Sequence, residues 1–148
     1  MDDEDLLKLD NQICFAVYAC AREITKLYHP LLQPLGLTYT QYIALLALWE
    51  KDGVTVKELG RRLYLDSGTL TPLLKKLETS GYLTRTRDPE DERNVRIELT
   101  PQGRSLKRQA CAIPEKLFVQ AGVTAEEAAN VHGQMMELLR RIHRQDEA

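Results

Sequence analysis

The chain has 148 residues, of which 43% are hydrophobic and 28% charged, so it can bury a core and has the composition of an ordinary soluble protein. Its longest apolar runs, such as 42–49, are far too short for a membrane span, and the start MDDEDLL is the opposite of a signal peptide, so we expect a cytoplasmic protein without membrane contact. The net charge of −2 is segregated: residues 55–111 carry +4 and the flanks −6, which favours oriented binding to an anionic partner such as DNA.

The first predicted element is one long helix over residues 5–32, which Pro30 and Pro34 end. Its apolar residues recur at steps of three, four and seven and therefore share one stripe. This stripe consists of Leu6, Ile13, Val17, Cys20, Ile24, Leu27 and Leu31. It is too long for a small domain to cover, so another subunit or the C-terminal helices must pack on it.

Two shorter helices follow, each opened by a threonine. Thr38 and Gln41 form a capping box for a helix that Gly53 terminates. Thr55 and Glu58 form a second capping box for a helix that ends near residue 65. The sequence therefore predicts a helix, a short turn and then the segment LDSGTLTPLLKKLETSGY over residues 65–82.

Segment 65–82 has the pattern of a DNA recognition helix. Leu70, Leu73, Leu74 and Leu77 form one apolar stripe that must face a core. The exposed side is expected to carry short hydroxyls, which can contact base edges, and lysines, which can contact phosphates. These residues are Ser67, Thr69, Thr71, Lys75 and Lys76.

The ends of this helix leave two alternatives because of Pro72. Asp66 or Ser67 can cap the first turn, and Gly81 can supply the left-handed residue after the last one. Since Pro72 lacks an amide donor, either the helix starts irregularly, or its regular part begins with Thr71 as the cap and Pro72 at the first position.

Two strand-like runs, 83–87 and 95–99, come next and are joined by the polar segment 88–94, which predicts a β-hairpin. Its basic residues are Arg85, Arg87, Arg93 and Arg96. A helix-turn-helix followed by a basic hairpin is typical of a winged-helix DNA-binding lobe, here expected over 36–100. The alternative is an ordinary helical core with a solvated, charged hairpin.

The remainder is predicted to be helical. Thr100 and Pro101 begin one helix, Pro114 breaks it, and Thr124 with Glu127 opens the last one. We therefore expect one domain over 1–148, mainly α with a small β-hairpin wing, in which helices over 5–34 and 101–145 form a homodimer. A two-fold dimer would place its recognition helices about 34 Å apart on a pseudo-palindromic operator in double-stranded DNA.

The order of these elements and the segment DERNVRIELTPQG resemble the MarR family of winged-helix repressors over essentially the whole chain. The segments LDNQICF and LTYTQY, with Tyr18 and Tyr28, resemble the organic-hydroperoxide sensor branch of that family, called OhrR. The resemblance implies that Cys14 is the peroxide-reactive cysteine, that Tyr28 and Tyr39 are its hydrogen-bond partners, and that Tyr18 is a neighbour in the pocket. Organic hydroperoxide would be the inducer.

The residues themselves give a further expectation for Cys14. A single helical cysteine is more often a small buried hydrophobe than a reactive thiol, but Cys14, Tyr18 and Tyr28 share a second stripe. Cys14 and Tyr28 are 14 residues apart, or about 21 Å along a helix, so Tyr28 must reach the Cys14 of the other subunit. Phe15 is expected to form an apolar wall that favours organic hydroperoxides.

The other cysteines receive lesser roles. Cys20 is expected in the core, and Cys111 is a poor candidate for a resolving cysteine, because two-cysteine members of the branch carry theirs near 118–123. A low-molecular-weight thiol is therefore the expected second reactant. The histidines show no ligand spacing with the cysteines, so no metal or cofactor is expected. Two rival functions remain: a thiol peroxidase, and a MarR-type repressor released by a non-covalent ligand such as a phenolic compound.

Overall fold

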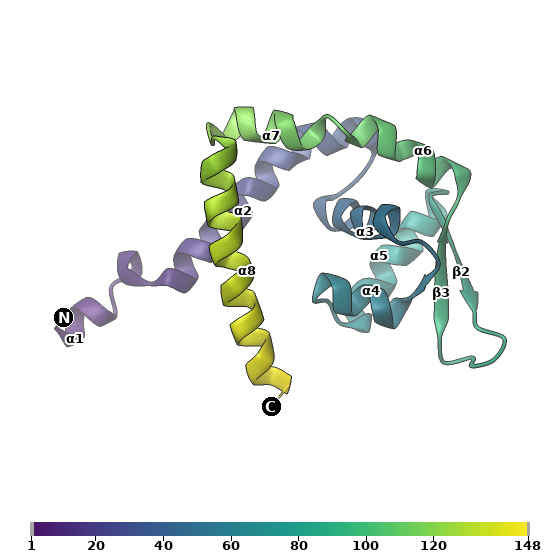
Figure 1. Ribbon diagram of the computed structural model, residues 1–148, viewed down its shortest axis with the longest axis horizontal. Helices are drawn as coiled ribbons and strands as arrows, with labels where there is room; N and C mark the ends of the chain where they lie inside the picture. The colour runs from purple at the N-terminus through teal and green to yellow at the C-terminus, as the bar shows by residue number, and fades with distance from the viewer. Residues whose placement is uncertain (1, 148) are drawn as a thin grey trace. The chain divides into compact units, whose positions relative to one another are not determined.

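The computed structural model describes residues 2–147, with side chains described through residue 145, so both ends of the expected 1–148 domain lie outside the described residues. One compact unit extends to Ile113 and a second begins at Pro114 (Figure 1). The elements in chain order are α1 (Asp3–Leu6), η1 (Leu9–Asn11), α2 (Ile13–Leu32), η2 (Gln33–Leu35), α3 (Tyr39–Glu50), β1 (Val54–Thr55), α4 (Val56–Leu63), α5 (Ser67–Thr79), β2 (Leu83–Arg87), β3 (Val95–Leu99), α6 (Pro101–Ala110), α7 (Ile113–Ala121) and α8 (Ala125–Glu147).

The core of the first unit is built mainly from leucines, which the end of α2, the helices α3, α4 and α5, and the sheet contribute. The most deeply buried large side chains are Leu32, Leu45, Leu48, Leu59, Leu70, Leu74, Leu77, Leu83 and Ile97. All four leucines of the predicted recognition-helix stripe are buried, which confirms the orientation expected for that helix. The predicted fold class, mainly α with a small wing, is also confirmed.

The two predicted wing strands have the predicted limits, and they pair antiparallel from Leu83 with Leu99 to Arg87 with Val95. The sheet nevertheless has three strands in the order β1-β3-β2, because Val54 pairs with Ile97 and Thr55 with Arg96. The two-residue strand β1 has too little length for a periodic pattern, so the sequence analysis predicted the hairpin but not this third strand.

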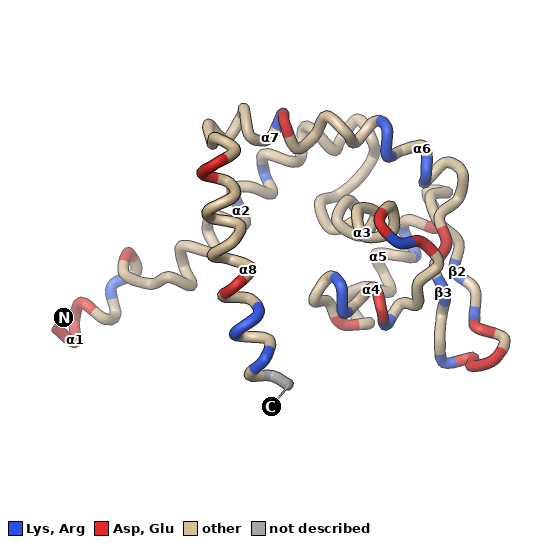
Figure 2. Tube along the Cα trace, viewed as in Figure 1, with Lys and Arg blue, Asp and Glu red and all other residues tan. Residues whose placement is uncertain are grey.

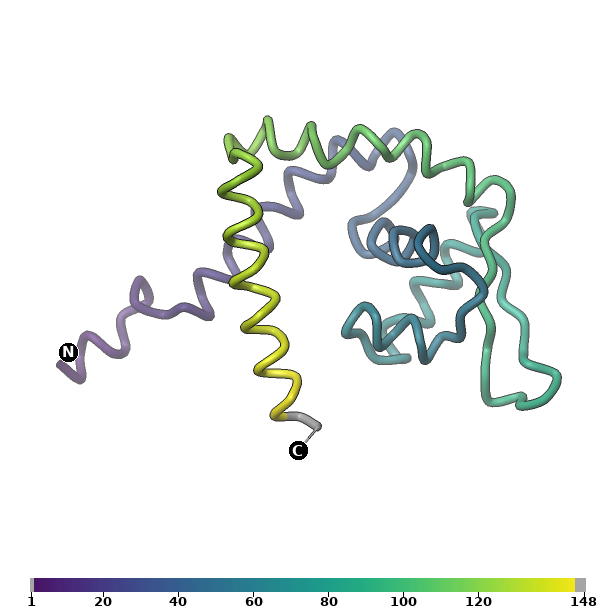
Figure 3. Tube along the Cα trace, viewed as in Figure 1, coloured from purple at the N-terminus to yellow at the C-terminus, as the bar shows by residue number. Residues whose placement is uncertain are grey.

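The single helix expected over 5–32 is interrupted, and that expectation was wrong. Polar side chains provide hydrogen bonds that compete with the helix: Gln12 Nε2 donates to the carbonyls of Leu6 (2.7 Å) and Lys8 (2.9 Å), and Asn11 Nδ2 donates to the carbonyl of Asp5 (2.8 Å). The continuous helix α2 begins only at Ile13. It continues two residues past Pro30 and then leads through η2 and Gly36, at φ 68°, towards α3 (Figure 3).

The predicted helix starts are confirmed by the hydrogen bonds at their caps. Gln41 N donates to Thr38 Oγ1 (3.3 Å) and Thr38 N donates to Gln41 Oε1 (3.0 Å), which completes the first capping box. Thr55 accepts from Glu58 N, and Thr100 accepts from Gly103 N, both at 3.1 Å. These caps fix where α3, α4 and α6 begin.

The first helix after the wing is tied closely to the lobe. Trp49 Nε1 donates to the carbonyl of Gly103 at 2.9 Å, which joins the end of α3 to the first turn of α6. A Cβ atom at Gly103 would overlap the carbonyl oxygen of Tyr82, so only glycine allows this close approach.

The second unit consists of α8 and most of α7. The predicted break between two helices near Pro114 is confirmed, because α6 ends at Ala110 and Pro114 lies in the first turn of α7. Thr124 and Glu127 form the predicted capping box of α8, with Glu127 N donating to Thr124 Oγ1 at 3.1 Å. Apolar side chains of α8, including Val131 at 56% and Ile142 at 55%, are exposed.

The apolar stripe of α2 is also largely uncovered in the single chain. Ile13 is 65% exposed, Val17 38% and Ile24 42%. Cys20 is exposed too, so it does not lie in the core that the described residues of the single chain form, where we had expected it. Within the described residues no single helix is long and apolar enough to cross a membrane. The length and hydropathy of a membrane span are reached only by two consecutive segments taken together, Ile13–Leu35 and Tyr39–Glu50, which are bent by 70° relative to one another.

Candidate DNA interface and sensor pocket

The recognition helix α5 begins directly after Asp66. Thr69 N donates to Asp66 Oδ1 at 2.7 Å, and this backbone hydrogen bond holds the pKa of the Asp66 carboxyl below its usual range. Pro72 lies inside a helix that runs from Ser67 to Thr79, so the alternative in which Thr71 caps the helix is wrong. The carboxylate cap starts the helix upstream of the proline and makes a second cap unnecessary.

The structure places the expected contact residues of α5 opposite the leucines. Ser67, Thr69, Lys75 and Lys76 are exposed, and Thr71 is half-buried. Gly81, at φ 86°, ends this region as expected and leads into β2. The hydroxyl residues therefore occupy the first two turns of the helix and the lysines the third.

The four wing arginines have different surroundings. Arg93 is 90% exposed on its side chain, and among the described residues it pairs with Asp91 in the same loop, where a run of acidic residues precedes it (Figure 2). Arg87 donates to the carbonyl of Glu92 at 3.0 Å. Arg93 and Arg87 thus remain at the outer end of the wing, where they can contact DNA.

Arg85 and Arg96 instead hold the wing in place. Arg85 Nε and Nη2 donate to Glu78 Oε1 at 3.3 and 3.2 Å, and the Arg85 amide donates to Glu78 Oε2 at 2.8 Å. Arg96 donates to the carbonyl of Gly53 at 2.6 Å and pairs with Asp88 at 3.7 Å. Their charges are largely compensated, which reduces their value as phosphate contacts.

A hollow of about 490 Å³ separates α4 and the start of α5 from the wing. Among the described residues that line it, the charged ones are Lys57, Arg85 and Arg93, and none is acidic. Lys57, which the sequence analysis missed, is exposed in the first turn of α4. A lysine at a helix N-terminus is unfavourable to the helix dipole, and this mismatch is the sequence signal that could have identified Lys57.

Three tyrosines form a cluster where α2 meets α3. The ring centroids of Tyr28 and Tyr39 are 4.8 Å apart, those of Tyr28 and Tyr42 5.6 Å, and those of Tyr39 and Tyr42 6.4 Å. Burial, with smaller contributions from the other two phenols, raises the pKa of Tyr28 to about 12. The sequence analysis missed Tyr42, although its spacing of three from Tyr39 places both on one helix face.

The other residues that the sequence analysis assigned to the sensor lie near the other end of α2. Cys14, Phe15 and Tyr18 are all exposed in the single chain. Arg22 Nη1 donates to the Tyr18 hydroxyl at 3.2 Å, and its guanidinium lies 5.6 Å from the centre of the Tyr18 ring. Since α2 is continuous from Ile13 to Leu32, the rise of a helix separates Cys14 from Tyr28 by about 21 Å, and one chain does not bring them together.

Comparison with known proteins identifies the family to which the chain belongs. The family model described as transcriptional regulator SarA/Rot matches residues 26–110. The organic hydroperoxide resistance transcriptional regulator of Bacillus subtilis (strain 168) is 47% identical, over 96% of this chain and 97% of that protein. The chain belongs to the MarR/SarA family of winged-helix transcriptional regulators.

Solved structures agree with this membership. AbfR of Staphylococcus epidermidis has been solved bound to DNA in an overoxidized form and in a reduced form. In the overoxidized structure AbfR is 34% identical to this protein, and the two structures align with a TM-score of 0.77 over 95% of this chain and 99% of the AbfR chain. MarR, at 24% identity and a TM-score of 0.76 over 98% of this chain and 96% of that chain, shares the fold. This MarR/SarA family member is an OhrR-like DNA-binding regulator, and the thiol-peroxidase alternative is set aside because the family consists of transcriptional regulators.

The other two cysteines of the protein, Cys20 and Cys111, are both exposed. Cys111 Sγ donates to the carbonyl of Lys107 at 3.2 Å, a bond within its own helix turn. In the described part of the chain no group of three or more His, Cys, Asp or Glu residues is arranged to hold a metal ion.

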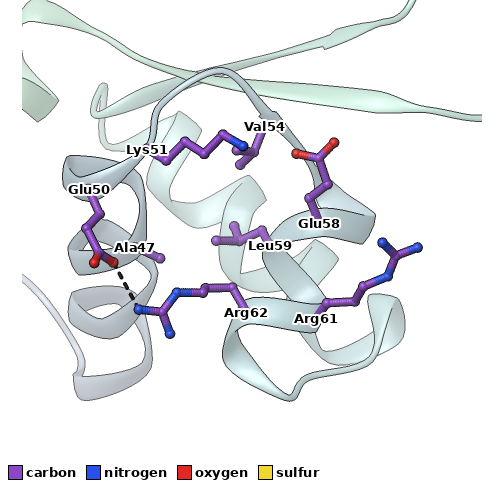
Figure 4. A pocket seen from close by; sticks show the side chains of 8 residues that line it. All are labelled: Ala47, Glu50, Lys51, Val54, Glu58, Leu59, Arg61 and Arg62. Atoms are coloured by element: carbon purple, nitrogen blue, oxygen red, sulfur yellow. Dashed lines mark hydrogen bonds and ion pairs between the residues drawn. The ribbon is translucent and has the colours of Figure 1, made fainter. Parts of the chain in front are cut away.

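A second hollow of the protein, with a volume of about 470 Å³, lies between α3 and α4 (Figure 4). None of the three clustered tyrosines lines it. Its floor is apolar, and Arg62 Nη2 pairs with Glu50 Oε2 across one side at 3.0 Å. Lys51 and Arg61 face Glu58 around the rest of its rim, so acidic and basic groups are mixed. This mixture does not select a ligand of one charge.

Proposed function

We propose that the protein is a homodimeric repressor that leaves its operator when an organic hydroperoxide oxidises Cys14. The observation that carries the proposal is the separation of the two halves of the sensor along α2. The phenols of Tyr28, Tyr39 and Tyr42 lie together at one end, and Cys14 lies near the other. The similarity to the regulator named for organic hydroperoxide resistance supports the same assignment.

A two-fold dimer would complete this sensor. The uncovered apolar stripe of α2 and the exposed apolar residues of α8 provide surface for a second copy. If two α2 helices pack antiparallel, the Cys14 end of one subunit meets the tyrosine end of the other. The packing that removes apolar surface from water would therefore also build the pocket.

The chemistry follows from the groups that this pocket would hold. The high pKa of Tyr28, about 12, keeps its phenol protonated at neutral pH, so it can donate a hydrogen bond to sulfur and favour the thiolate. The Cys14 thiolate would attack the terminal oxygen of ROOH, the O–O bond would break, and the alkoxide would take a proton and leave as ROH. The sulfenic acid would then react with a low-molecular-weight thiol, giving a mixed disulfide and water.

Apolar neighbours would select the substrate. Phe15, which follows Cys14 directly, and Val17, about one turn further along α2, are partly exposed in the single chain, at 39% and 38%. In the dimer they would line the approach to the sulfur and favour organic hydroperoxides over hydrogen peroxide. Tyr18, which Arg22 orients, would be a further pocket neighbour.

We propose a division of DNA contacts that follows the exposure of each side chain. Residues at the start of α5 would enter the major groove, and Arg93 would enter or flank the minor groove. Lys57, Lys75 and Lys76 would contact phosphates, with Arg87 beside them on the wing. The major-groove residues are Ser67, Thr69 and Thr71.

Oxidation would release DNA through the dimer. A bulky, uncharged adduct at Cys14 would remove the charge that the phenols hold and crowd the pocket. Because α3 carries two of the tyrosines and packs in the DNA-binding core, a shift at the pocket would move the lobe. A small rotation changes the distance between two recognition helices that must match a repeat of about 34 Å.

The experiment compares serine variants of the cysteines. Each variant is bound to operator DNA and treated with sub-stoichiometric cumene hydroperoxide, while mass spectrometry identifies the oxidised residue. Cys14→Ser should bind DNA and ignore peroxide, and Cys20→Ser and Cys111→Ser should respond like the wild type. Release of the Cys14→Ser protein by peroxide would contradict the proposal. Its release by a phenolic ligand alone would favour a repressor in which Cys14 only lines a ligand pocket.

A further inference from the structure

Pro72 occupies the sixth position of α5, inside the helix and on its exposed side. In an α-helix each carbonyl oxygen accepts a hydrogen bond from the amide four residues later. Pro72 has no amide hydrogen, so the carbonyl of Gly68 cannot receive the bond that residue 72 would normally supply. The proline ring also pushes against that carbonyl, which tilts it outward from the helix axis.

The freed carbonyl lies on the side of α5 that is open to a ligand. Gly68, Pro72 and Lys75 follow one another along the exposed face, and the buried leucines occupy the opposite one. Gly68 has no side chain to cover its own carbonyl. A Cβ atom there would meet only Asp66 Oδ1, at 3.3 Å, so the space beside this backbone is otherwise open.

We propose that the carbonyl oxygen of Gly68 reads the operator by accepting a hydrogen bond from the exocyclic amino group of a cytosine or an adenine in the major groove. In that groove the amino groups of these two bases are the hydrogen-bond donors. The lysines of α5 can only donate and its hydroxyls can donate or accept, whereas a free carbonyl can only accept. Its direction is fixed by the helix backbone, and binding costs no side-chain entropy.

The energetics of α5 agree with this role. A proline inside a helix destabilises that helix. Pro72 is exposed and does not belong to the leucine core, so core packing does not require a proline at this position. The Asp66 cap offsets part of the cost by binding the Thr69 amide at 2.7 Å. A residue that destabilises its own helix on an exposed face is expected at a position where it strengthens binding to a ligand.

The first test is Pro72→Ala, measured on the reduced full-length protein without peroxide, so the result does not depend on the role of Cys14. Alanine restores the amide and occupies the Gly68 carbonyl. We expect the denaturation midpoint to rise while operator affinity falls about tenfold, the range for one base contact. Affinity for non-specific DNA should not change. The control is Thr79→Ala, on the same helix, which raises helix propensity and should leave operator affinity as it is.

The second test changes the DNA. Single cytosines of the operator are replaced by 2-pyrimidinone and single adenines by purine, so that each change removes one exocyclic amino group from the major groove. Operator affinity of the wild-type protein should fall about tenfold when the base at one position of each half-site is changed. The same change should not lower the operator affinity of Pro72→Ala any further. The proposal would be overturned if Pro72→Ala bound the operator as tightly as the wild type. It would also be overturned if, at every position, the base change and Pro72→Ala lowered operator affinity additively.

Discussion

The ion pair between Glu78 and Arg85 joins the last turn of the recognition helix to the outer strand of the wing. We predict that Glu78→Ala loosens the wing and weakens operator binding, although Glu78 itself need not touch DNA. Glu78 accepts three hydrogen bonds from Arg85, one of them from the backbone amide at 2.8 Å. Because β2 is an edge strand, this amide would otherwise have only water as a partner.

The size of the effect follows from the partial burial of the pair. The side chains of Arg85 and Glu78 are 23% and 37% exposed. Hydrogen bonds to charged groups contribute about 1.5–3 kcal/mol when buried, whereas exposed ion pairs contribute at most about 1 kcal/mol. We therefore expect a coupling free energy of about 1–2 kcal/mol between the two residues, which corresponds to a loss of about tenfold in operator affinity if the wing must reorder on binding.

The assay is a double-mutant cycle of Glu78→Ala, Arg85→Ala and the pair, by urea denaturation and by operator binding. Arg87→Ala is the control for the urea measurement, because its guanidinium donates to the Glu92 carbonyl within the wing loop and does not join the wing to α5. Hydroxyl-radical footprints should lose protection at the flanks, where the wing binds, and keep it under the recognition helix. A coupling energy below about 0.3 kcal/mol, with unchanged footprints, would refute the role of the pair.

Three further predictions concern the wing, the dimer and the tyrosines. Arg93→Ala should weaken operator binding most at low salt without lowering the urea midpoint, and titrations at several salt concentrations will show a shallower slope if its contact is electrostatic. Ile24→Asp should convert the dimer to a folded monomer in light scattering, whereas Lys26→Ser beside it should stay dimeric. Since the pKa of Tyr28 is raised from 10.0 to about 12, its contribution to stability is complete below pH 10 and is lost as pH rises through 12. Near-ultraviolet titration of tyrosinate should show this late ionisation, and Tyr28→Phe should remove it.

Local signals in the sequence were sufficient for the DNA-binding lobe. The limits of both wing strands, the leucine stripe of α5 and the threonine caps all depend on residues within a few positions of one another. Periodicity and capping act over such distances, so a single sequence contains the information. The net charge of segment 55–111 likewise indicated where an anionic partner would bind.

Other features were decided only by the tertiary structure. The third strand has only two residues. The Tyr42 ring of α3 packs against the Tyr28 ring of α2, and Arg85 forms an ion pair with Glu78. Each depends on groups distant in the chain that folding brings together, and no local pattern records which partner a side chain meets. The sequence by itself determined which residues are candidates for sensing peroxide and for contacting DNA. The tertiary structure decided which of them remain exposed to do so, because burial and pairing are properties of the whole fold.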